Sequence, residues 1–375
     1  MSILHLIYFI YINKIKILFS QVDNLNQSIL KGGLLSMSNN GQLVAPHLSS
    51  YEIQYMSILK KIYERGYSDG VNERTGVATK RLPGAVIQVD VGEEFPILRS
   101  KKVAAKTAQR EIEWIWKDMS NNIHDLPAKI WDAWADKNGS IGKSYGYQIA
   151  QPVCIYTDSI NRDPSTYRSY PNQREFVRNY LKEFPNGRQC TTTIWNPSQL
   201  SGMNLVPCVH TCNWNLDDGR LNLVLDQRSG DFPYGVPFNT TQYAELMCMF
   251  AYDLSVEPGI LTHVIADAHI YDRQMKGVEL QLAYYDILTA MCNFGESKAL
   301  ELANALYERK DDFPGEDIPE PEVLIQRAAS ICYTIAKPEF VIDSKDRDMM
   351  SYRADQCHVE NYTYMGNVSF GEVVV

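Results

Sequence analysis

Residues 205–239 read LVPCVHTCNWNLDDGRLNLVLDQRSGDFPYGVPFN, and this stretch decides the fold around the candidate chemistry. Two apolar-rich segments, 208–216 and 221–226, flank the turn sequence DDG, which predicts an antiparallel pair of β-strands. The second strand returns beside the first, so Arg228 is expected close to Cys208. A cation near a thiol favours its ionisation to the nucleophilic thiolate. Taken alone, a cysteine with apolar neighbours also fits a packed core position.

The segments on either side of this stretch mix helical and strand-like patterns. Apolar residues at helical spacing predict helices, and short runs rich in β-branched and aromatic residues predict strands. The expected helices are 50–65, 102–117, the second half of 167–184, 241–254 and 280–307 with an interruption at Gly295; the expected strands are 85–91, 95–98, 191–195 and 260–265. The sequence has no glycine-rich phosphate loop and no regular alternation of strand and helix. We therefore expect an α+β single domain, with a mixed, mostly antiparallel sheet packed with helices.

The composition excludes several classes of protein. Of the 375 residues, 45% are apolar and 22% are charged, which is typical of a globular chain and not of a disordered or collagenous one. Lys and Arg number 36 against 45 Asp and Glu, and the net charge of −9 argues against a protein that coats nucleic acid. The eight cysteines are scattered through a chain long enough to bury its own core, and we interpret them as reduced thiols of a cytoplasmic protein. Cys208 and Cys212 have no second pair at zinc-site spacing, so no metal site is expected.

The first 36 residues differ in character from the rest, because they combine Ile, Lys, Asn and Tyr without capping or turn signals. The apolar run 3–12 is too short to span a bilayer, and it lacks the basic region and the cleavage site of a signal peptide. Lys31-Gly32-Gly33 can be encoded by a ribosome-binding sequence shortly before Met37. We therefore expect 1–36 to be an unfolded upstream extension, Met37 to be the start, the domain to cover 37–375, and no membrane association.

A set of motifs occurs in the order and at the spacing of the thymidylate synthases. These motifs are Pro207-Cys208, Gln227-Arg228-Ser229, Asp231, GVPFN at 235–239 and DAHIY at 267–271. Further matches are Arg74-Thr75-Gly76, 95–98, Glu111-Ile112, 130–134, Tyr145-Gly146 and 338–375. The chain thus resembles this family over most of its length, and 154–167 and 284–321 look like family-variable insertions.

The resemblance implies the reductive methylation of dUMP to dTMP, with 5,10-methylenetetrahydrofolate as the donor of carbon and hydride. Carbon 5 of uracil is a poor nucleophile, so a thiolate, which the resemblance assigns to Cys208, first adds at carbon 6. Glu111 matches the acid–base glutamate of the family, which works through ordered water with Tyr145 and Asn239 near it. Asn239 also matches the residue that reads the base, because an amide can donate to O4 of uracil and accept from N3–H together.

The same resemblance implies the binding residues and a two-fold homodimer. For dUMP they are Arg74, Arg228 and Ser229 at the phosphate, Arg188 donated across the dimer interface, His269 and Tyr271 at the 3′-hydroxyl, and Gln227, Asp231 and Asn239. For the folate they are Trp131, Leu205, Asp231 and Val375. Judged without the resemblance, Glu111 fits a surface position, His269 and Tyr271 fit a core pair, and Trp131 fits a core aromatic. No nucleic acid is required as a partner.

Several positions depart from the family pattern. Gln189 stands where the family normally has a second arginine beside Arg188, which removes one charge from the phosphate site. Val209 follows the nucleophile in place of the usual histidine, and His210 is expected on the opposite strand face. Other departures are Asn213, Ala266 and the run Asp272-Arg273-Gln274.

These departures leave two alternative functions open. One is a pyrimidine deoxynucleotide hydroxymethylase on the same scaffold, which lets water add to the intermediate that both enzymes share. The other is a non-enzymatic relative that binds a nucleotide or RNA. Trp131 and the complete tail 373–375 favour the synthase, which keeps water out while hydride arrives.

Overall fold

The computed structural model describes residues 36–37, 43–44, 46–71 and 75–371. The predictions on residues 1–35, Arg74 and Val375 lie outside the described residues. The chain forms two compact units. The larger comprises Ser49–Tyr284, Asp312–Asp317 and Ala336–Val375, and the smaller comprises Met1–Leu48, Tyr285–Asp311 and Ile318–Ile335.

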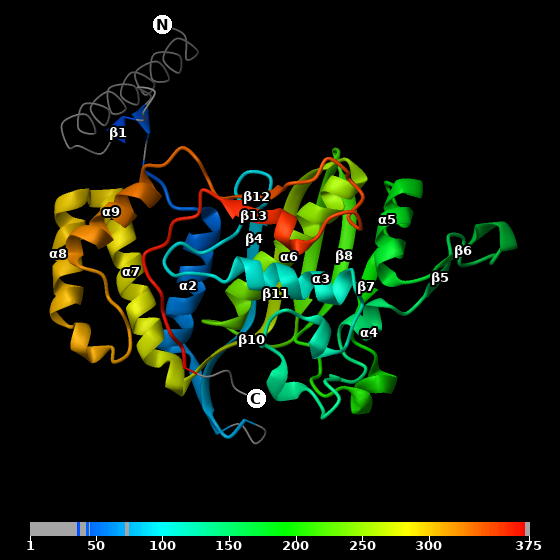
Figure 1. The fold of residues 1–375 in the computed structure, drawn as a ribbon, viewed down its shortest axis with the longest axis horizontal. Helices are drawn as coiled ribbons and strands as arrows, with labels where there is room; N and C mark the ends of the chain where they lie inside the picture. The colour runs from blue at the N-terminus through cyan, green and yellow to red at the C-terminus, as the bar shows by residue number, and fades with distance from the viewer. Residues whose placement is uncertain (1–35, 38–42, 45, 72–74, 372–375) are drawn as a thin grey trace, which may run out of the picture. The chain divides into compact units, whose positions relative to one another are not determined.

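A seven-stranded sheet forms the centre of the larger unit (Figure 1). Its strand order is β3-β4-β11-β9-β8-β7, and β10 pairs with β11. The strands are β3 (Tyr67–Val71), β4 (Ala78–Asp90), β7 (Thr191–Thr193), β8 (Val209–Asp217), β9 (Arg220–Gln227), β10 (Gly230–Asp231) and β11 (Glu257–Tyr271). β9 and β10 run parallel to β11, whereas the other pairs are antiparallel. The prediction of an α+β fold with a mixed, mostly antiparallel sheet is confirmed.

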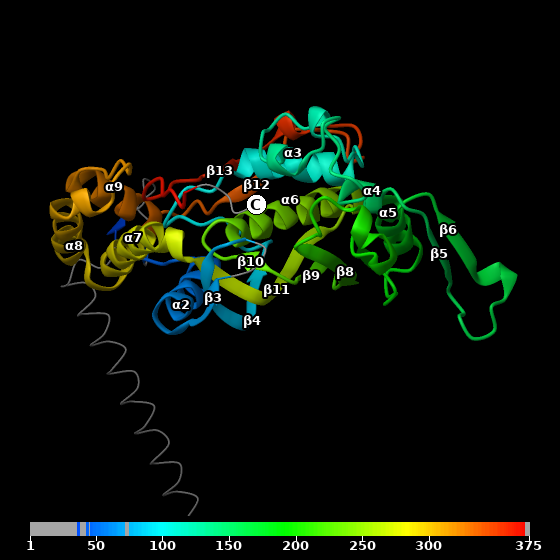
Figure 2. The ribbon, with the colours of Figure 1, turned by 90° about the horizontal axis from the view of Figure 1, so that it is seen from below.

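Helices pack on this sheet in layers. In the larger unit they are α2 (Ser50–Arg65), α3 (Ala105–Trp116), α4 (Gly146–Ile149), α5 (Gln173–Glu183) and α6 (Gly235–Leu254). The helix α7 (Met275–Phe294) begins in this unit and ends in the smaller one. α6 lies along one face of the sheet against β9 and β11, and α3 packs on α6 (Figure 2). Because α6 has the sheet on one side and α3 on another, its buried residues are distributed around most of its circumference.

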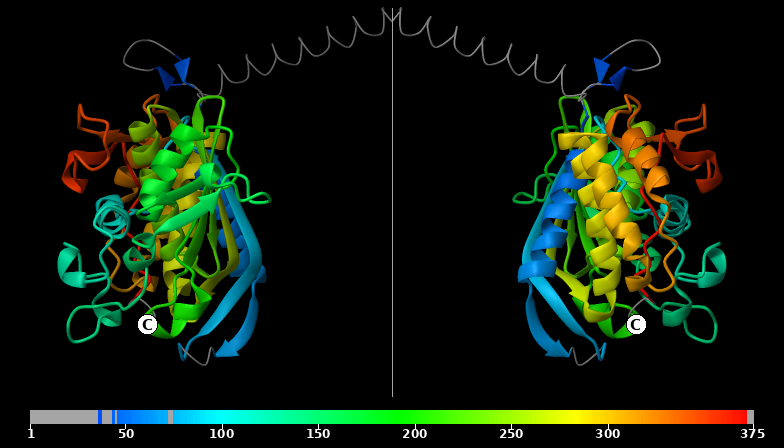
Figure 3. Two further views of the ribbon diagram at one scale, coloured as in Figure 1. Left: turned by 90° about the vertical axis from the view of Figure 1, so that its right-hand side faces the viewer. Right: turned by 90° about the vertical axis from the view of Figure 1, so that its left-hand side faces the viewer.

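α2 covers the part of the sheet that contains β4. The helix begins at Ser49, whose hydroxyl accepts the N–H of Glu52, and it ends at Gly66. Its buried face follows helical spacing and contains Glu52 together with the apolar residues Tyr51, Tyr55, Met56, Leu59 and Ile62. β3 and the first residues of β4 run side by side as a two-stranded ribbon (Figure 3). The helix predicted from residue 50 to Gly66 is confirmed.

The β8–β9 hairpin follows the predicted turn. Asp218 and Gly219 have φ values of 49° and 72°, as the tight hairpin turns with two left-handed residues require. A bulge interrupts the pairing between Val209 and Thr211. The bulge allows Val209 and Cys212, three residues apart, to be buried together, which a regular strand does not permit. The hairpin prediction is confirmed, and the bulge directly after Cys208 is an addition to it.

A second hairpin occupies the first predicted insertion, 154–167. Its strands β5 (Val153–Tyr156) and β6 (Tyr167–Tyr170) are antiparallel, and it projects from the rest of the larger unit (Figures 1 and 2). The Tyr156 and Tyr167 rings lie 5.2 Å apart, and Ile160 near the tip is exposed. The hairpin therefore adds a local element without changing the central sheet.

Short strand pairs complete the described elements. β12 (Glu339–Ile342) pairs with β13 (Cys357–Glu360) in the larger unit, and β1 (Ser36–Met37) pairs with β2 (Leu43–Val44) in the smaller one. Across the described ranges, every helix is too short or too polar to cross a membrane.

The smaller unit is built mainly of helices. α8 (Glu296–Glu308) packs against α9 (Pro321–Cys332), and the second half of α7 belongs to the same unit. The predicted helix 280–307 is two helices, since Gly295 with a φ of 84° separates α7 from α8. Cys292 at the end of α7 and Cys332 at the end of α9 form a disulfide, with Cα atoms 5.8 Å apart. The prediction of eight reduced thiols is wrong for this pair, because two helix ends distant in sequence converge.

Candidate active site

Arg228 fixes the backbone around Cys208, which stands directly before β8. The Arg228 N–H donates to the Cys208 carbonyl at 2.9 Å. The guanidinium donates through Nε to the Pro207 carbonyl and through Nη2 to the Val206 carbonyl, both at 2.8 Å. The prediction that the hairpin returns Arg228 beside Cys208 is therefore confirmed.

Cys208 lines a cavity of about 740 Å³ in the larger unit. Six predicted residues share this cavity, namely Cys208, Glu111, Tyr145 and Asn239 from the catalytic set and Trp131 and Leu205 from the folate set. They come from segments that are far apart in the sequence. Residues of the predicted set that do not line it are Arg188, Gln227, Arg228, Ser229, Asp231, His269 and Tyr271.

Two helices supply much of the cavity wall. α3 contributes Thr107, Glu111 and Ile115, which are four residues apart and so lie on one helix face. α6 contributes a similarly spaced set, Gly235, Phe238, Asn239 and Gln242. Because α3 packs on α6, Glu111 and Asn239 are held on neighbouring rigid elements.

Glu111 is buried and hydrogen-bonded within this wall. Its Oε1 accepts the indole N–H of Trp131 at 2.8 Å. Burial raises the pKa of Glu111 to about 7, against the opposing hydrogen bonds of Trp131 and Gln242. A carboxyl with a pKa near neutrality can both give and take a proton under physiological conditions. The surface position that Glu111 would fit by itself is excluded.

Tyr145 joins the cysteine to the aromatic side of the cavity. Its Oη accepts the N–H of Cys208 at 3.4 Å, and its ring meets that of Trp131 edge-on at 4.8 Å. Burial raises the pKa of Tyr145 well above its usual value, so the phenol stays protonated as a donor. Its φ of 45° is a strained conformation for a residue with a side chain, and such strain concentrates at functional sites.

Both ends of the Gln227 side-chain amide contact other groups of the protein. Its Nε2 donates to the Ser229 carbonyl at 2.8 Å, and its Oε1 lies 2.8 Å from Nε2 of His263. The other ring nitrogen of His263 lies 3.0 Å from the hydroxyl of Thr240, the residue after Asn239. The sequence reasoning missed His263, and the only available signal was a lone histidine in an apolar strand.

Asp231, His269 and Tyr271 are neighbours in the structure. β10 pairs Asp231 with His269, and the rings of His269 and Tyr271 meet edge-on at 4.9 Å. Gln274 contacts both sides of this group: its Nε2 donates to the Asp231 carboxylate, and its Oε1 accepts the N–H of Tyr271. The Gln274 amide therefore contacts both Asp231, which the resemblance assigns to the folate, and Tyr271, which it assigns to the deoxyribose.

Arg188 lies away from the Cys208 cavity within a single chain. It lines a second cavity of about 530 Å³ with Tyr180, Phe184 and Gln189 after α5. The Gln189 N–H donates to the Tyr180 hydroxyl at 3.4 Å. Arg188 and Gln189 thus share one surface, as their adjacency in the sequence requires.

Three lysines on the wall of the Cys208 cavity were missed by the sequence reasoning. They are Lys101, Lys102 and Lys129. Lys101 stands over the Phe370 ring at 5.2 Å, and burial lowers the pKa of Lys101 to about 8 against the attraction of Asp231 and Glu52. The pair Lys101-Lys102, three residues after the segment 95–98, was the available signal. These cations suit an anionic ligand group.

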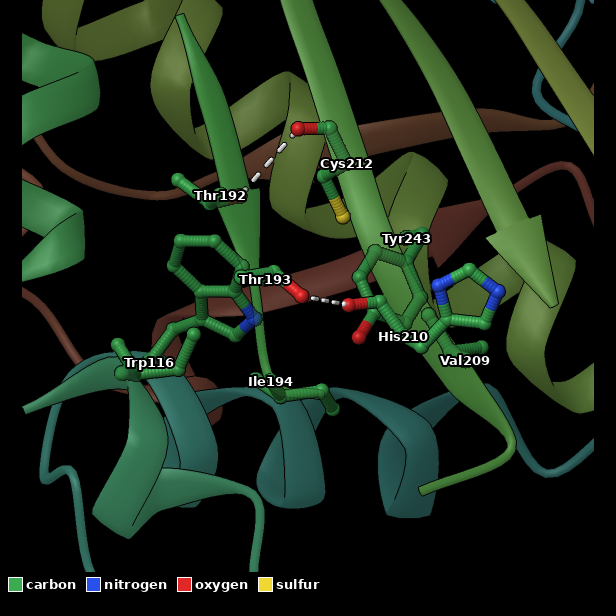
Figure 4. Close-up of a pocket in the computed structure, with 9 residues that line it drawn as sticks. Trp116, Thr192, Thr193, Ile194, Val209, His210, Cys212 and Tyr243 are labelled. Atoms are coloured by element: carbon green, nitrogen blue, oxygen red, sulfur yellow. Dashed lines mark hydrogen bonds between the residues drawn. The ribbon is translucent and has the colours of Figure 1, made fainter. Parts of the chain in front are cut away.

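A much smaller cavity, about 10 Å³, lies where β7 meets β8 (Figure 4). The Thr193 hydroxyl donates to the His210 carbonyl at 2.9 Å, and the Thr192 hydroxyl donates to the Cys212 carbonyl at 3.5 Å (Figure 4). These bonds anchor the bulged start of β8. Burial raises the pKa of Cys212 far above its usual value, so this thiol is a poor nucleophile.

Among the residues that the structure places, no three His, Cys, Asp or Glu side chains gather as ligands for a metal ion.

The α+β scaffold brings a cysteine, a buried carboxyl and an amide to one cavity, an arrangement typical of an enzyme active site. Residues 53–302, more than half of the chain, match the family described as Thymidylate synthase. The chain therefore belongs to the thymidylate synthase family, and it is a methyltransferase.

Individual relatives agree with this family. A thymidylate synthase of Clostridium beijerinckii is 40% identical over 238 residues, which are 63% of this chain and 82% of that protein. A thymidylate synthase of Bacillus licheniformis is 35% identical over 246 residues, 63% of this chain and 84% of that protein. The solved structure of the thermostable thymidylate synthase A from Bacillus subtilis aligns with a TM-score of 0.64 at 28% identity, over 87% of this chain and 99% of that chain. The fold that the resemblance implied is confirmed.

Proposed function

We propose that this chain converts dUMP to dTMP by reductive methylation with 5,10-methylenetetrahydrofolate. The observation that carries the proposal is that Cys208, Glu111, Tyr145 and Asn239 line a single cavity in a chain of this family. In the proposal, the Cys208 thiolate forms a bond to carbon 6 of uracil, and the electron pair of the C5–C6 double bond moves toward O4. The Asn239 amide donates to O4 and accepts from N3–H, which selects uracil over cytosine.

The residues of the cavity fit a folate. Its volume lies in the range of sites for ligands of this size, and its walls combine the aromatic Trp131 and Phe370 with Leu205. Lys101 and Lys102 offer cations to the carboxylates of such a ligand. When bound, methylenetetrahydrofolate supplies a one-carbon group and a hydride. Trp131 then excludes water above the base, while Glu111 moves protons at O4 and carbon 5 through ordered water.

We also propose a two-fold homodimer in the cytoplasm, with Arg188 of one subunit reaching the phosphate of dUMP in the other. The support is that Arg188 lies away from the Cys208 cavity of its own chain. Arg228 and Ser229 contribute from the same chain, because they follow β9 directly beside Cys208. Gln189 supplies an amide where the family has a second guanidinium.

Turnover with dUMP and methylenetetrahydrofolate tests the proposal. We expect one dihydrofolate for each dTMP, with dihydrofolate followed by absorbance and the nucleotide by mass spectrometry. Cys208→Ser should lose all measurable turnover, because a serine hydroxyl supplies almost no alkoxide at neutral pH. Cys212→Ser, four residues further along the chain in β8, is the matched control and should keep activity.

Two results would contradict the proposal. A hydroxymethyl product without dihydrofolate would identify a different reaction on the same scaffold. A Cys208→Ser variant with more than about a hundredth of the wild-type kcat would exclude Cys208 as the nucleophile.

A further inference from the structure

Gln274 occupies the turn between the strand that carries His269 and the helix α7. It ends the short 3-10 helix η5 (Asp272–Gln274) and is almost fully buried, at 2% exposure. Asp272-Arg273-Gln274 is also a run in which this sequence departs from the family pattern. A buried amide must find partners for its two donors and its carbonyl oxygen, so its contacts are informative.

The amide nitrogen of Gln274 binds the Asp231 carboxylate. Nε2 lies 3.0 Å from Oδ1 and 2.8 Å from Oδ2 of Asp231. This contact orients the carboxylate, because both oxygens are held by one donor group. A carboxylate has about four lone-pair directions, and the Tyr234 N–H takes one more at 3.3 Å, so Asp231 keeps acceptor capacity for a ligand.

The carbonyl oxygen of the same amide holds Tyr271. Gln274 Oε1 accepts the Tyr271 N–H at 2.9 Å. Tyr271 in turn stacks edge-on with His269, which β10 pairs with Asp231. Gln274 therefore closes a ring of contacts that joins Asp231 to Tyr271 through two independent routes.

We propose that Gln274 is a positioning residue, which holds the Asp231 carboxylate toward bound folate and couples it to Tyr271 on the nucleotide side. This inference rests on the proposed function. The chemistry it serves is recognition of the N–H donors of a pterin by an ionised, oriented carboxylate.

The electrostatic surroundings of Asp231 support this role. Burial raises the pKa of Asp231, whereas the Gln274 hydrogen bond opposes the rise and favours the charged form. The other groups that face Asp231 are His269 on β11, Lys101 beside the cavity and Tyr55 on α2. None of these is changed in a Gln274 variant, so the effect of the amide can be isolated.

Two substitutions separate the two contacts of Gln274. Gln274→Glu keeps an oxygen for the Tyr271 N–H but replaces the donor to Asp231 with a second carboxyl. Gln274→Met keeps the side-chain length and removes both contacts. Gln173→Met is the matched control, because Gln173 is a buried glutamine on α5 whose amide donates to the Gln148 and Thr193 carbonyls, away from Asp231.

The test measures steady-state constants and binding in the full chain. We expect Gln274→Glu to raise the KM for the folate about tenfold or more while the Kd for dUMP changes little. Gln274→Met should raise both the KM for the folate and the Kd for dUMP. In the pH profile of this variant, the fall of kcat/KM for the folate on the acid side should move to higher pH, because Asp231 without its hydrogen-bond donor protonates more readily. Gln173→Met should keep the wild-type constants and pH profile.

Binding of dihydrofolate in the presence of saturating dUMP, followed by quenching of tryptophan fluorescence, separates this inference from the proposed function. If the wild type binds dihydrofolate but makes no dTMP, the proposed function fails, and weaker binding by Gln274→Glu still supports the positioning role. If both Gln274 variants fold and keep the wild-type folate constants and pH profile, the inference is overturned although turnover stands. Equal losses in Gln173→Met would likewise overturn it, and a wild type that binds no dihydrofolate would overturn both.

Discussion

Burial of a single carboxyl sets the acid–base behaviour of the candidate site. Glu111 would be ionised in water at neutral pH, but desolvation raises its pKa to about 7. The sequence could not predict this burial from periodicity, because α3 is buried continuously from Glu111 to Trp116 and so lacks a clear polar face. Only the family resemblance singled out Glu111, and its hydrogen bond from Trp131 is visible only in the fold.

We expect Glu111→Gln to remove a pH-dependent cost to stability. The folded-state pKa of about 7 lies above the ordinary value of 4.5, so the folded chain holds a proton that the unfolded chain has released. The contribution of Glu111 to the free energy of unfolding therefore falls as the pH rises between these values. The variant should gain roughly 3 kcal/mol relative to the wild type from about pH 4.5 to above about pH 7.

Urea denaturation across this pH range measures the difference, with Glu64→Gln at an exposed position of α2 as the control. A difference between Glu111→Gln and the wild type that stays constant with pH would mean that Glu111 titrates as an ordinary glutamate. The same variant should lose most of its turnover, because its amide neither gives nor takes a proton.

At the scale of elements, the buried imidazole of His263 links Thr240 on α6, next to Asn239, with Gln227 at the end of β9, next to Arg228. Burial lowers the pKa of His263 to about 3, so the ring is neutral and carries one proton. Gln227 donates to Ser229 through its nitrogen, so its oxygen faces His263, and the proton of the ring must lie on Nε2. Nδ1 then carries the lone pair and lies 3.0 Å from the Thr240 hydroxyl, which also donates to the Val236 carbonyl at 2.8 Å. His263 on β11 thus contacts both Gln227 on β9 and Thr240 on α6.

A double-mutant cycle tests this link. His263→Phe should lower the free energy of unfolding by about 1–3 kcal/mol, because it leaves the oxygen of Gln227 buried without its partner. The added change Gln227→Leu should cost less in the His263→Phe background than in the wild type, since both polar partners are then removed. Urea denaturation of the four proteins gives the coupling. Strictly additive costs would show that the two side chains do not stabilise each other.

The elements themselves were predictable to different degrees. The β8–β9 hairpin follows from the DDG turn, because few sequences accommodate two left-handed residues in a row. The bulge after Cys208 has no comparable signal, since it depends on which side chains of β8 meet the core formed by other segments. Gly295 indicated an interruption between α7 and α8. That the interruption is a complete helix end is seen only from the positive φ of Gly295 in the structure.

At the scale of the whole molecule, contacts between residues far apart in the sequence could not be predicted from local patterns. The α+β class followed from the mixture of patterns, whereas the meeting of Cys292 with Cys332 needed the packing of α7 and α9, which no local pattern contains. The same holds for the amide of Gln274 between Asp231 and Tyr271. Arg188 lies away from the Cys208 cavity in one chain, which supports the proposal that it serves the site of a second chain.

If Arg188 serves the neighbouring site, active protein must be a dimer in which each site combines two chains. Cys208→Ser lacks the nucleophile in its own site, and Arg188→Ala lacks a phosphate contact in the partner's site, so each homodimer should be impaired. In a hybrid dimer, the site with Cys208 from one chain receives Arg188 from the other and is complete. Equal co-expression with two affinity tags should therefore restore turnover to about a quarter of wild type, because half of the dimers are hybrids with one complete site each. Purification through both tags in sequence isolates the hybrid and should raise this to about half. Isolated hybrids without recovered turnover, or sedimentation of the active wild type as a monomer, would contradict the shared site.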